Sequence, residues 1–336
     1  MSTRRTRISL RGWGGVAAMA VACALTAVFA LLLPLTRAAD GDGSTGVGGP
    51  GLASGVQARA DSCTDPERSL PPSGDESGPA VKAIKKRGYL VVGVDQNSYH
   101  WGYRDPNSVK KSSELEGFDI DLAHEIAQKI LGDRDLIRFR AIPTNQRIPA
   151  IQHGDVDMVV RTMTISCDRL EEVAFSTAYF QTGQQVLAPK TSSITGYDKS
   201  LTNKRICTAA GSTAYDRLDA DRKAGTLAPG ADISTTVPNQ LDCLVRLQLG
   251  EVDAVVTDSA LAAGQAAQDP TVELKGEPFT KEFYGVAMKR GTDDLVRRVN
   301  QVLEDFRKDG GWQHSYDEWL EDGLGAASGP PAPKYK

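Results

Sequence analysis

The sequence of 336 residues has no strong excess of charge of either sign and few histidines, the side chain that acid–base enzymes use most often. Its 39 basic and 43 acidic residues give a net charge of −4, which excludes the basic surface that nucleic-acid binding requires. It has 4 histidines and no GxSxG, Walker or HExxH motif. No CxxC pair occurs either, so we expect neither a metal nor a cofactor.

What the sequence does contain is a long apolar run near its N-terminus, from Gly12 to Thr36. The arginines that precede it are Arg4, Arg5, Arg7 and Arg11. We predict a membrane anchor over residues 1–38, with the arginines in the cytoplasm and the rest of the chain exported. Cleavage of a signal peptide near Ala38 and lipidation at Cys23 are the alternatives, and apolar sequence after Cys23 disfavours lipidation.

Both ends of the remaining chain have the composition of flexible segments. Residues 39–80 are rich in Gly, Ser, Pro and Asp and predict a flexible linker. The linker contains Gly46–Gly51, which matches GxGxxG, but no strand precedes it and no helix follows, so it predicts no phosphate loop. Residues 323–336 predict a disordered tail.

Cysteines outside the N-terminal segment are even in number, as expected of disulfides in an oxidising compartment. Four cysteines allow three pairings. Cys207 lies on a predicted strand and Cys243 on a helix of the same region, which favours Cys207–Cys243 and leaves Cys63–Cys167. Free buried thiols are the alternative.

Helical and strand patterns alternate between the two flexible ends, which predicts α/β sheets with helices on both faces. The first series has helices at 81–87, 119–131 and 147–153 and strands at 89–94, 136–142, 156–160 and 184–188. The second series has strands at 205–208, 232–237 and 254–256 and helices at 214–221, 240–249 and 259–267. The last elements are a strand at 285–288 and helices at 295–309 and 312–320.

The two series predict two lobes, with the chain leaving the first near Ala188 and returning near Tyr284. The first lobe would then comprise residues 81–188 and 284–322, and the second residues 189–283. Two lobes joined by two strands can hinge, and ligands of such sheets bind at the carboxyl ends of the strands. The cleft between the lobes is therefore the expected site.

The segment Gly117–Ile130, Gly-Phe-Asp-Ile-Asp-Leu-Ala-His-Glu-Ile-Ala-Gln-Lys-Ile, opens an amphipathic helix with acidic residues. It resembles the signature of the bacterial extracellular solute-binding proteins, family 3, which are polar amino-acid binders of ABC transporters. The resemblance implies a two-lobed periplasmic-binding-protein fold of type II, the Venus-flytrap fold, and a monomer that is not an enzyme. The closest similarity is to actinobacterial glutamate/aspartate-type binding proteins.

A second resemblance lies in Arg161–Arg169, followed by Phe175–Tyr179. In the family, the arginine at the place of Arg169 grips the α-carboxylate of the ligand. Thr164 would contribute its hydroxyl, and Arg161 and Thr162 their backbone groups. The planar donor pairs of arginine suit a carboxylate. A solvated surface arginine is the alternative for Arg169.

A third resemblance lies in Thr144–Pro149, which is similar to the S-x-N-R-I-P segment of glutamate and aspartate binders. It implies that Arg147 reaches a side-chain carboxylate, with Thr144 as a second specificity residue. Arg161 would add a further positive charge near the cleft, which favours an acidic ligand. The alternative is that Arg147 only starts a helix or pairs with Asp155 or Asp157.

In the second lobe, the same resemblance assigns a carboxylate contact to Thr213 and the ligand's α-ammonium to Asp258, with Thr257 beside it. Asp258 has a competing role as the N-cap of the helix that follows. Asp95 and Trp101 follow the first strand, where they would form the outer wall of the pocket or pack the lobe.

These residues predict binding of glutamate or aspartate, or else glutamine or asparagine, by lobe closure. The partner would be an ABC permease or a membrane sensor protein on the extracytoplasmic side of the cell membrane. A dehydratase-type enzyme on the same fold and a pure sensor without transport are the rival functions. An enzyme would need an acid or base in the cleft, and His124 and His153 lie on helices away from the strand ends.

Overall fold

The computed structural model describes residues 63–105 and 115–336, within the compact unit Ala60–Lys336. The predicted anchor over residues 1–38, its alternative cleavage and lipidation sites, and residues 39–62 of the predicted linker lie outside the described residues. Within the described ranges, no helix has both the length and the hydrophobicity needed to cross a bilayer. The unit consists of two α/β lobes, as predicted.

The first lobe is built on a five-stranded sheet in the order β5-β2-β6-β15-β7. Its strands are β2 (Leu90–Val94), β5 (Ile137–Ala141), β6 (Met158–Val159), β7 (Ala174–Phe175) and β15 (Ala287–Met288). β2 pairs in parallel with β5 and β6, whereas β15 runs antiparallel to β6 and β7. β2 has an entirely apolar sequence because a parallel strand inside a sheet is covered on both faces.

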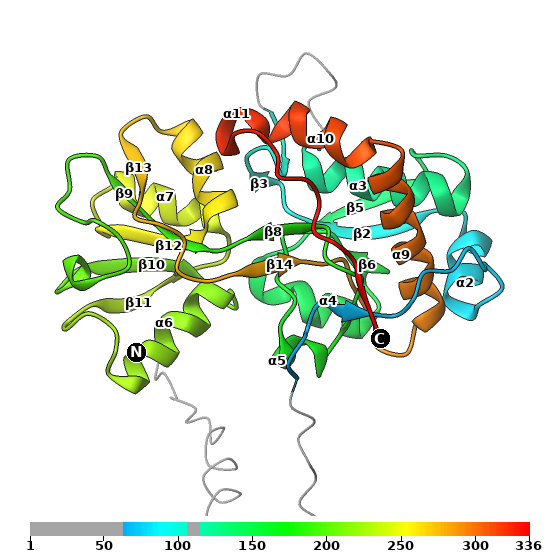
Figure 1. The fold of residues 1–336 in the computed structure, drawn as a ribbon, viewed down its shortest axis with the longest axis horizontal. Helices are drawn as coiled ribbons and strands as arrows, with labels where there is room; N and C mark the ends of the chain where they lie inside the picture. The colour runs from blue at the N-terminus through cyan, green and yellow to red at the C-terminus, as the bar shows by residue number, and fades with distance from the viewer. Residues whose placement is uncertain (1–62, 106–114) are drawn as a thin grey trace, which may run out of the picture. The chain divides into compact units, whose positions relative to one another are not determined.

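Helices cover both faces of this first sheet (Figure 1). The helices that share one hydrophobic cluster with β2 are α2 (Pro79–Arg87), α3 (Phe118–Leu131), α9 (Asp293–Lys308) and α10 (Gly311–Trp319). The helices on the other face are η1 (Thr144–Gln146), α4 (Arg147–His153) and α5 (Cys167–Leu170). The apolar stripe predicted for α3 is its buried face: Ile120, Ala123, Ile126, Ala127 and Ile130.

The second lobe has its own five-stranded sheet, in the order β11-β10-β12-β9-β13. Its strands are β9 (Gln184–Pro189), β10 (Arg205–Ala209), β11 (Asp232–Val237), β12 (Ala254–Asp258) and β13 (Val272–Lys275). One face is covered by α6 (Thr213–Ala224), and the other by α7 (Gln240–Gln248) and α8 (Ser259–Gln268). The 3-10 turn η2 (Lys199–Leu201) precedes β10.

Two antiparallel strands, β8 (Phe180–Thr182) and β14 (Glu282–Tyr284), form the crossing between the lobes. Figure 1 shows both running from one sheet to the other. The outward crossing therefore lies at β8, before the expected position at Ala188, because β9 pairs with β12 and β13 of the second sheet. The local sequence of a short buried strand does not indicate which sheet it will join.

The C-terminal segment is ordered along the first lobe, in contrast to the tail expected from its composition. After α11 (Glu321–Leu324), the chain returns so that β16 (Lys334–Tyr335) pairs in parallel with β1 (Arg68–Ser69) of the predicted linker. The Tyr335 hydroxyl donates to Glu304 at 2.7 Å. Composition does not reveal such a pairing, because its two strands are separated by most of the chain.

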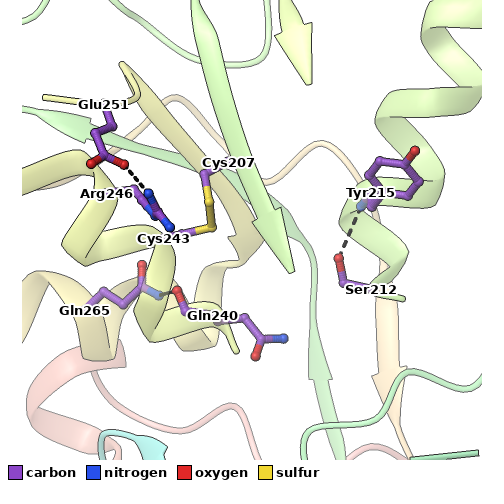
Figure 2. The surroundings of a disulfide bond; sticks show 8 residues. All are labelled: Cys207, Ser212, Tyr215, Gln240, Cys243, Arg246, Glu251 and Gln265. Atoms are coloured by element: carbon purple, nitrogen blue, oxygen red, sulfur yellow. Dashed lines mark hydrogen bonds and ion pairs between the residues drawn. A yellow bond between two sulfur atoms is a disulfide. The ribbon is translucent and has the colours of Figure 1, made fainter. Parts of the chain in front are cut away.

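Both disulfides predicted from the sequence are present. Cys63–Cys167 has a Cα–Cα distance of 5.8 Å, and Cys207–Cys243 one of 5.6 Å, both in the usual range. Figure 2 shows Cys207 on β10 joined to Cys243 on α7. The first bridge fixes the described end of the linker to α5, and the second ties a strand of the second lobe to the helix that covers it.

The Cys207–Cys243 bridge closes a loop with a sequence separation of 36. Because a crosslink limits the freedom of the unfolded chain, a Cys207→Ser/Cys243→Ser variant should lose about 3 to 4 kcal/mol of unfolding free energy. Urea unfolding followed by circular dichroism measures this loss. A variant as stable as the wild type would show that the bridge contributes nothing, and dithiothreitol should lower the wild-type midpoint more than the variant's.

Candidate functional site

A small polar cavity lies where the two lobes meet. Its volume is about 10 Å³, close to the space of one water molecule, so the lobes are closed on each other. The lining residues of the first lobe are Arg147, Thr162, Thr164 and Arg169. The second lobe and the start of β9 contribute Gln184, Ser212, Thr213, Ala214, Gln240, Thr257 and Asp258.

The cavity forms at the carboxyl ends of strands from both sheets. Asp258 is the last residue of β12, Thr162 follows β6, and Ser212 caps α6 just after β10. The Ser212 hydroxyl accepts a hydrogen bond from the Tyr215 N–H at 3.2 Å, which starts α6 at the edge of the cavity. Strand ends carry the free polar groups of an α/β sheet, so a binding site is expected there.

Arg169 is held in α5 with its guanidinium directed toward the second lobe. It donates to the carbonyl of Thr164 at 2.8 Å and, across the boundary, to the carbonyl of Gly211 at 3.1 Å. No described acidic side chain forms a salt bridge with it. Burial lowers the pKa of Arg169, while the charges of Asp216 and Glu282 oppose that shift. The guanidinium thus keeps unused donors beside the cavity.

Arg147 begins α4 and also contacts only backbone carbonyls. It donates to Thr144 at 2.9 Å, to Arg161 at 3.3 Å and to Gly211 at 3.4 Å. Burial, together with the neighbouring charges of Arg169 and Arg161, holds the pKa of Arg147 well below its usual value. Two buried cations therefore meet at one carbonyl of the opposite lobe, an arrangement that an anion would stabilise.

Asp258 lies on the second-lobe side of the cavity and is also buried. It accepts from the Gln184 amide at 2.5 Å and from the Tyr284 hydroxyl at 2.5 Å. Burial first, and the nearby charge of Glu282 second, raise the pKa of Asp258 to about 8. A cation near Asp258 would reverse that shift, because it stabilises the ionised carboxylate. The cavity thus has a cationic side and an acidic side.

Thr162 has a strained backbone, with φ at 39° in the left-handed region that β-branched residues rarely adopt. Its N–H donates to Asp119 at 2.9 Å, and the same carboxyl accepts from the Tyr179 hydroxyl at 2.8 Å. Burial raises the pKa of Asp119 to about 7. The Thr162 hydroxyl is buried without a hydrogen-bond partner among the described residues, so it remains available to the cavity.

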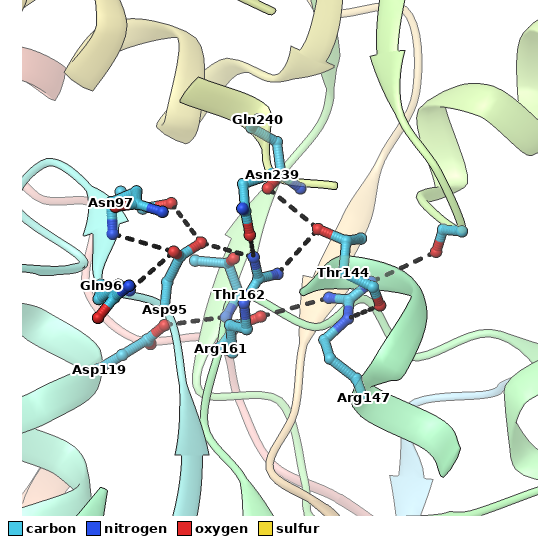
Figure 3. Close-up of polar contacts among 12 residues, drawn as sticks. Asp95, Gln96, Asn97, Asp119, Thr144, Arg147, Arg161, Thr162, Asn239 and Gln240 are labelled. Carbon is cyan, nitrogen blue, oxygen red and sulfur yellow. Dashed lines mark hydrogen bonds and ion pairs between the residues drawn. The ribbon is translucent and has the colours of Figure 1, made fainter. Parts of the chain in front are cut away.

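Arg161 and Thr144 lie behind the cavity lining, in a network that joins the lobes (Figure 3). Arg161 is fully buried and forms a salt bridge with Asp95 at 2.7 Å. It also donates to the Thr144 hydroxyl at 3.1 Å and to Asn239 of the second lobe at 3.1 Å. The charge of Arg161 is already paired, so it adds no free positive charge to the cavity.

Trp101 also lies away from the cavity. Its indole N–H donates to the carbonyl of Ala260 at 3.2 Å, and its ring packs edge-on against Phe180 and Tyr284. The predicted site residues that do line the cavity are Arg147, Thr162, Thr164, Arg169, Thr213, Thr257 and Asp258. Trp101 instead packs where the lobes meet, and Asp95 belongs to the charge network that joins them.

Besides Ser212 and Gln240 in the cavity lining, two polar residues of the site were not identified from the sequence: Gln184 at the start of β9 and Glu282 on the hinge strand β14. Both are buried, and the Gln184 amide donates to Glu282 at 2.8 Å. The only sequence signal is that each polar residue adjoins a predicted crossing strand. The neighbouring sequence of a polar residue on a hinge strand looks the same as that of a polar residue on a solvent-exposed strand, so it does not reveal the buried position.

The family model for bacterial extracellular solute-binding proteins, family 3, matches residues 90–322. The chain belongs to this family. It is 34% identical over 242 residues to the ABC transporter glutamine-binding protein GlnH of Bacillus subtilis, covering 72% of this chain and 85% of that protein. It is 29% identical over 276 residues to the glutamate-binding protein GluB of Corynebacterium glutamicum, covering 78% and 90%.

A solved structure of similar fold is that of an ancestral amino acid-binding protein, a precursor of cyclohexadienyl dehydratase. Its TM-score is 0.62 and its sequence identity 30%, with 72% of this chain and 100% of that chain covered. The family, the two-lobed fold and the class of extracellular solute-binding protein are therefore established for this chain, and the curated relatives named here are binding proteins.

Asp258 should make stability without ligand depend on pH. The folded-state pKa of Asp258, about 8, exceeds the ordinary 3.8. Its favourable contribution to the free energy of unfolding is therefore complete below about pH 4 and is lost as the pH rises through 8. The neutral Asp258→Asn variant lacks this loss. Its melting temperature relative to wild type should therefore be higher by a few degrees at pH 8 than at pH 5.

Thermal melts of the ligand-free proteins at both pH values measure this difference. The exposed residue Asp155 provides the control, because its salt-bridge partner Arg140 stays charged throughout this range, so Asp155→Asn should shift the melting temperature equally at both pH values. The same relative stability of Asp258→Asn at pH 5 and pH 8 would contradict the assignment.

Proposed function

We propose that this protein binds glutamate or aspartate, or their amides glutamine and asparagine, in the cavity between its lobes. The observation that carries the proposal is the separation of charge there: Arg169 and Arg147 on the first lobe, and Asp258 on the second. An amino acid is a zwitterion of matching polarity. The named relatives, a glutamine-binding and a glutamate-binding protein, support the same ligand class.

In the proposed complex, the guanidinium of Arg169 binds the α-carboxylate and Asp258 binds the α-ammonium. The unused N–H donors of Arg169 suit a carboxylate, and charge-assisted pairs are the strong class of hydrogen bond. Arg147 binds the oxygen atoms of the side chain, either a carboxylate or an amide carbonyl. Thr162, whose hydroxyl is buried and unpartnered, supplies a further polar contact.

We propose that ligand binding stabilises the closed arrangement of the lobes, with rotation about β8 and β14. Arg169 and Arg147 donate to Gly211 of the other lobe only when the lobes are closed. A ligand that contacts both lobes adds contacts to the closed state alone, so it shifts the population toward that state. The cavity must widen to admit an amino acid, because about 10 Å³ holds only one water molecule.

The proposed activity is binding rather than catalysis. We propose that the protein acts as a monomer outside the cytoplasm and delivers its ligand to an ABC permease or signals to a membrane sensor. None of the 4 histidines lines the cavity. The similarity to a dehydratase precursor makes a turnover test necessary. Ligand recovered chemically unchanged after long incubation supports binding, whereas accumulation of a product would identify an enzyme.

Isothermal titration calorimetry with glutamate, aspartate, glutamine and asparagine tests the ligand class. We expect at least one of them to bind in the micromolar range, which corresponds to about −8 kcal/mol. Arginine and leucine are the controls, because the side chain of arginine has the wrong charge for Arg147 and the side chain of leucine has no polar atom. Absence of heat from all four polar amino acids would disprove the proposed function.

Variants at the two cavity arginines should have different effects. Arg169→Ala should lower the affinity for every amino acid by roughly 100-fold, because each ligand loses the charge-assisted contact to its α-carboxylate. Arg147→Ala should weaken the acidic ligands by roughly tenfold and the amides by less. Calorimetry with Arg222→Ala as control, an exposed arginine on α6, separates these effects from a general loss of charge. Equal losses for all ligands in both cavity variants would refute this division of roles.

A further inference from the structure

Glu282 is a buried carboxylate directly behind the cavity, at the point where both lobes and the hinge meet. It lies on β14, and one of its oxygens accepts from the hydroxyls of Thr164 at 2.6 Å and Thr213 at 2.8 Å. Its other oxygen accepts from the Gln184 amide at 2.8 Å and the Thr280 hydroxyl at 3.2 Å. Thr164, Thr213 and Gln184 all line the cavity, so Glu282 orients three of its walls.

These bonds determine what the two threonines can offer a ligand. A hydroxyl has a single hydrogen to donate and lone pairs to accept. Thr164 and Thr213 both donate that hydrogen to Glu282, so toward the cavity they present lone pairs. They can then accept from an N–H group but cannot donate to a carboxylate. A carboxylate near Thr213 would have to use the free backbone N–H groups at the start of α6.

The amide oxygen of Gln184 is a third hydrogen-bond acceptor at the cavity, after the hydroxyls of Thr164 and Thr213. Its orientation follows from the amide nitrogen, which lies near Asp258 at 2.5 Å, Glu282 at 2.8 Å and Thr213 at 3.1 Å. The reverse orientation would set the amide oxygen against two carboxyl groups, so the network fixes the nitrogen there. The amide oxygen is then buried with no partner among the described residues, and Gln184 lines the cavity.

Glu282 also changes the charge balance. Arg147 and Arg169 bring two positive charges to the cavity. The carboxylate of Glu282 offsets one of them, and Asp258 offsets the other once the ammonium group of a bound ligand ionises it. A ligand with no net charge, such as an amide amino acid, leaves this balance intact. A ligand with an additional carboxylate adds one buried negative charge to it, and juxtaposed like charges are costly.

We infer that Glu282 is a positioning residue that sets the choice between acidic and amide amino acids, by disfavouring the acidic ones relative to their amides. The inference rests on the proposed function and names the residue that tunes it. Arg147 supplies hydrogen-bond donors that favour an acidic side chain of the ligand. Glu282 disfavours such a side chain through its own negative charge and through the acceptors that it orients toward the cavity. The ratio of affinities for glutamate and glutamine thus reflects both residues.

The test is calorimetry of the full chain with glutamate and glutamine, on wild type and on Glu282→Gln. The substituted amide removes the charge and can donate to the threonine oxygens, which frees their hydroxyl hydrogens for a ligand carboxylate. We expect the ratio of glutamate to glutamine affinity to rise at least about tenfold. Glu277→Gln, an exposed neighbour with the same change of charge, should leave the ratio unchanged.

A second variant covers the case in which Glu282→Gln does not fold, as judged by circular dichroism. Thr213→Val removes a hydrogen-bond acceptor from the cavity. It should therefore lower the affinity for glutamine more than that for glutamate, so that the ratio of glutamate to glutamine affinity rises about tenfold. An unchanged ratio in either folded variant, with a wild type that binds, overturns the role of Glu282 alone. A wild type that binds neither acidic nor amide amino acids overturns the proposed function and this inference together.

Discussion

Two buried guanidinium groups, those of Arg147 and Arg169, share one backbone carbonyl across the boundary between the lobes. Buried charges are costly unless opposite charges and hydrogen bonds compensate them. Glu282 supplies opposite charge, Asp258 adds to it when a ligand cation ionises it, and neither carboxyl forms a salt bridge to either arginine. This incomplete compensation lets the same residues hold the lobes together and keep donors and acceptors for a zwitterion.

The rest of the unit keeps these charged groups in register. The Cys207–Cys243 bridge ties β10, which leads to Gly211, to α7, whose first turn meets Thr144 of the other lobe. The Gln265 side chain donates to the carbonyl of Gln240 at 2.8 Å and holds α8 against that turn (Figure 2). The segment around Gly211 and the first turn of α7 are thus braced by contacts outside the cavity.

The three arginines that the sequence placed at the cleft have different roles because their partners differ. Arg161 is neutralised by Asp95, and with Thr144 and Asn239 it forms a contact between the lobes. Among the described residues, the side-chain hydrogen bonds of Arg147 and Arg169 go only to backbone carbonyls, so both arginines retain the capacity to bind an anion. Pairing with a distant carboxylate, rather than the local motif, separates a structural arginine from one available to a ligand.

The sequence by itself determined most of the longer helices and strands, the two lobes and the favoured cysteine pairs, and its resemblance to the family predicted most of the residues that line the cavity. Periodicity is a local property and suffices for α3, whereas Arg169 and Asp258 were predicted from the resemblance of local motifs to the family. Only the tertiary structure decided that β9 joins the second sheet, that β16 pairs with β1, that Asp95 neutralises Arg161 and that Glu282 lies behind the cavity. Each of these depends on a partner far away in the chain, and a buried strand or a lone carboxylate does not encode its partner in its neighbours.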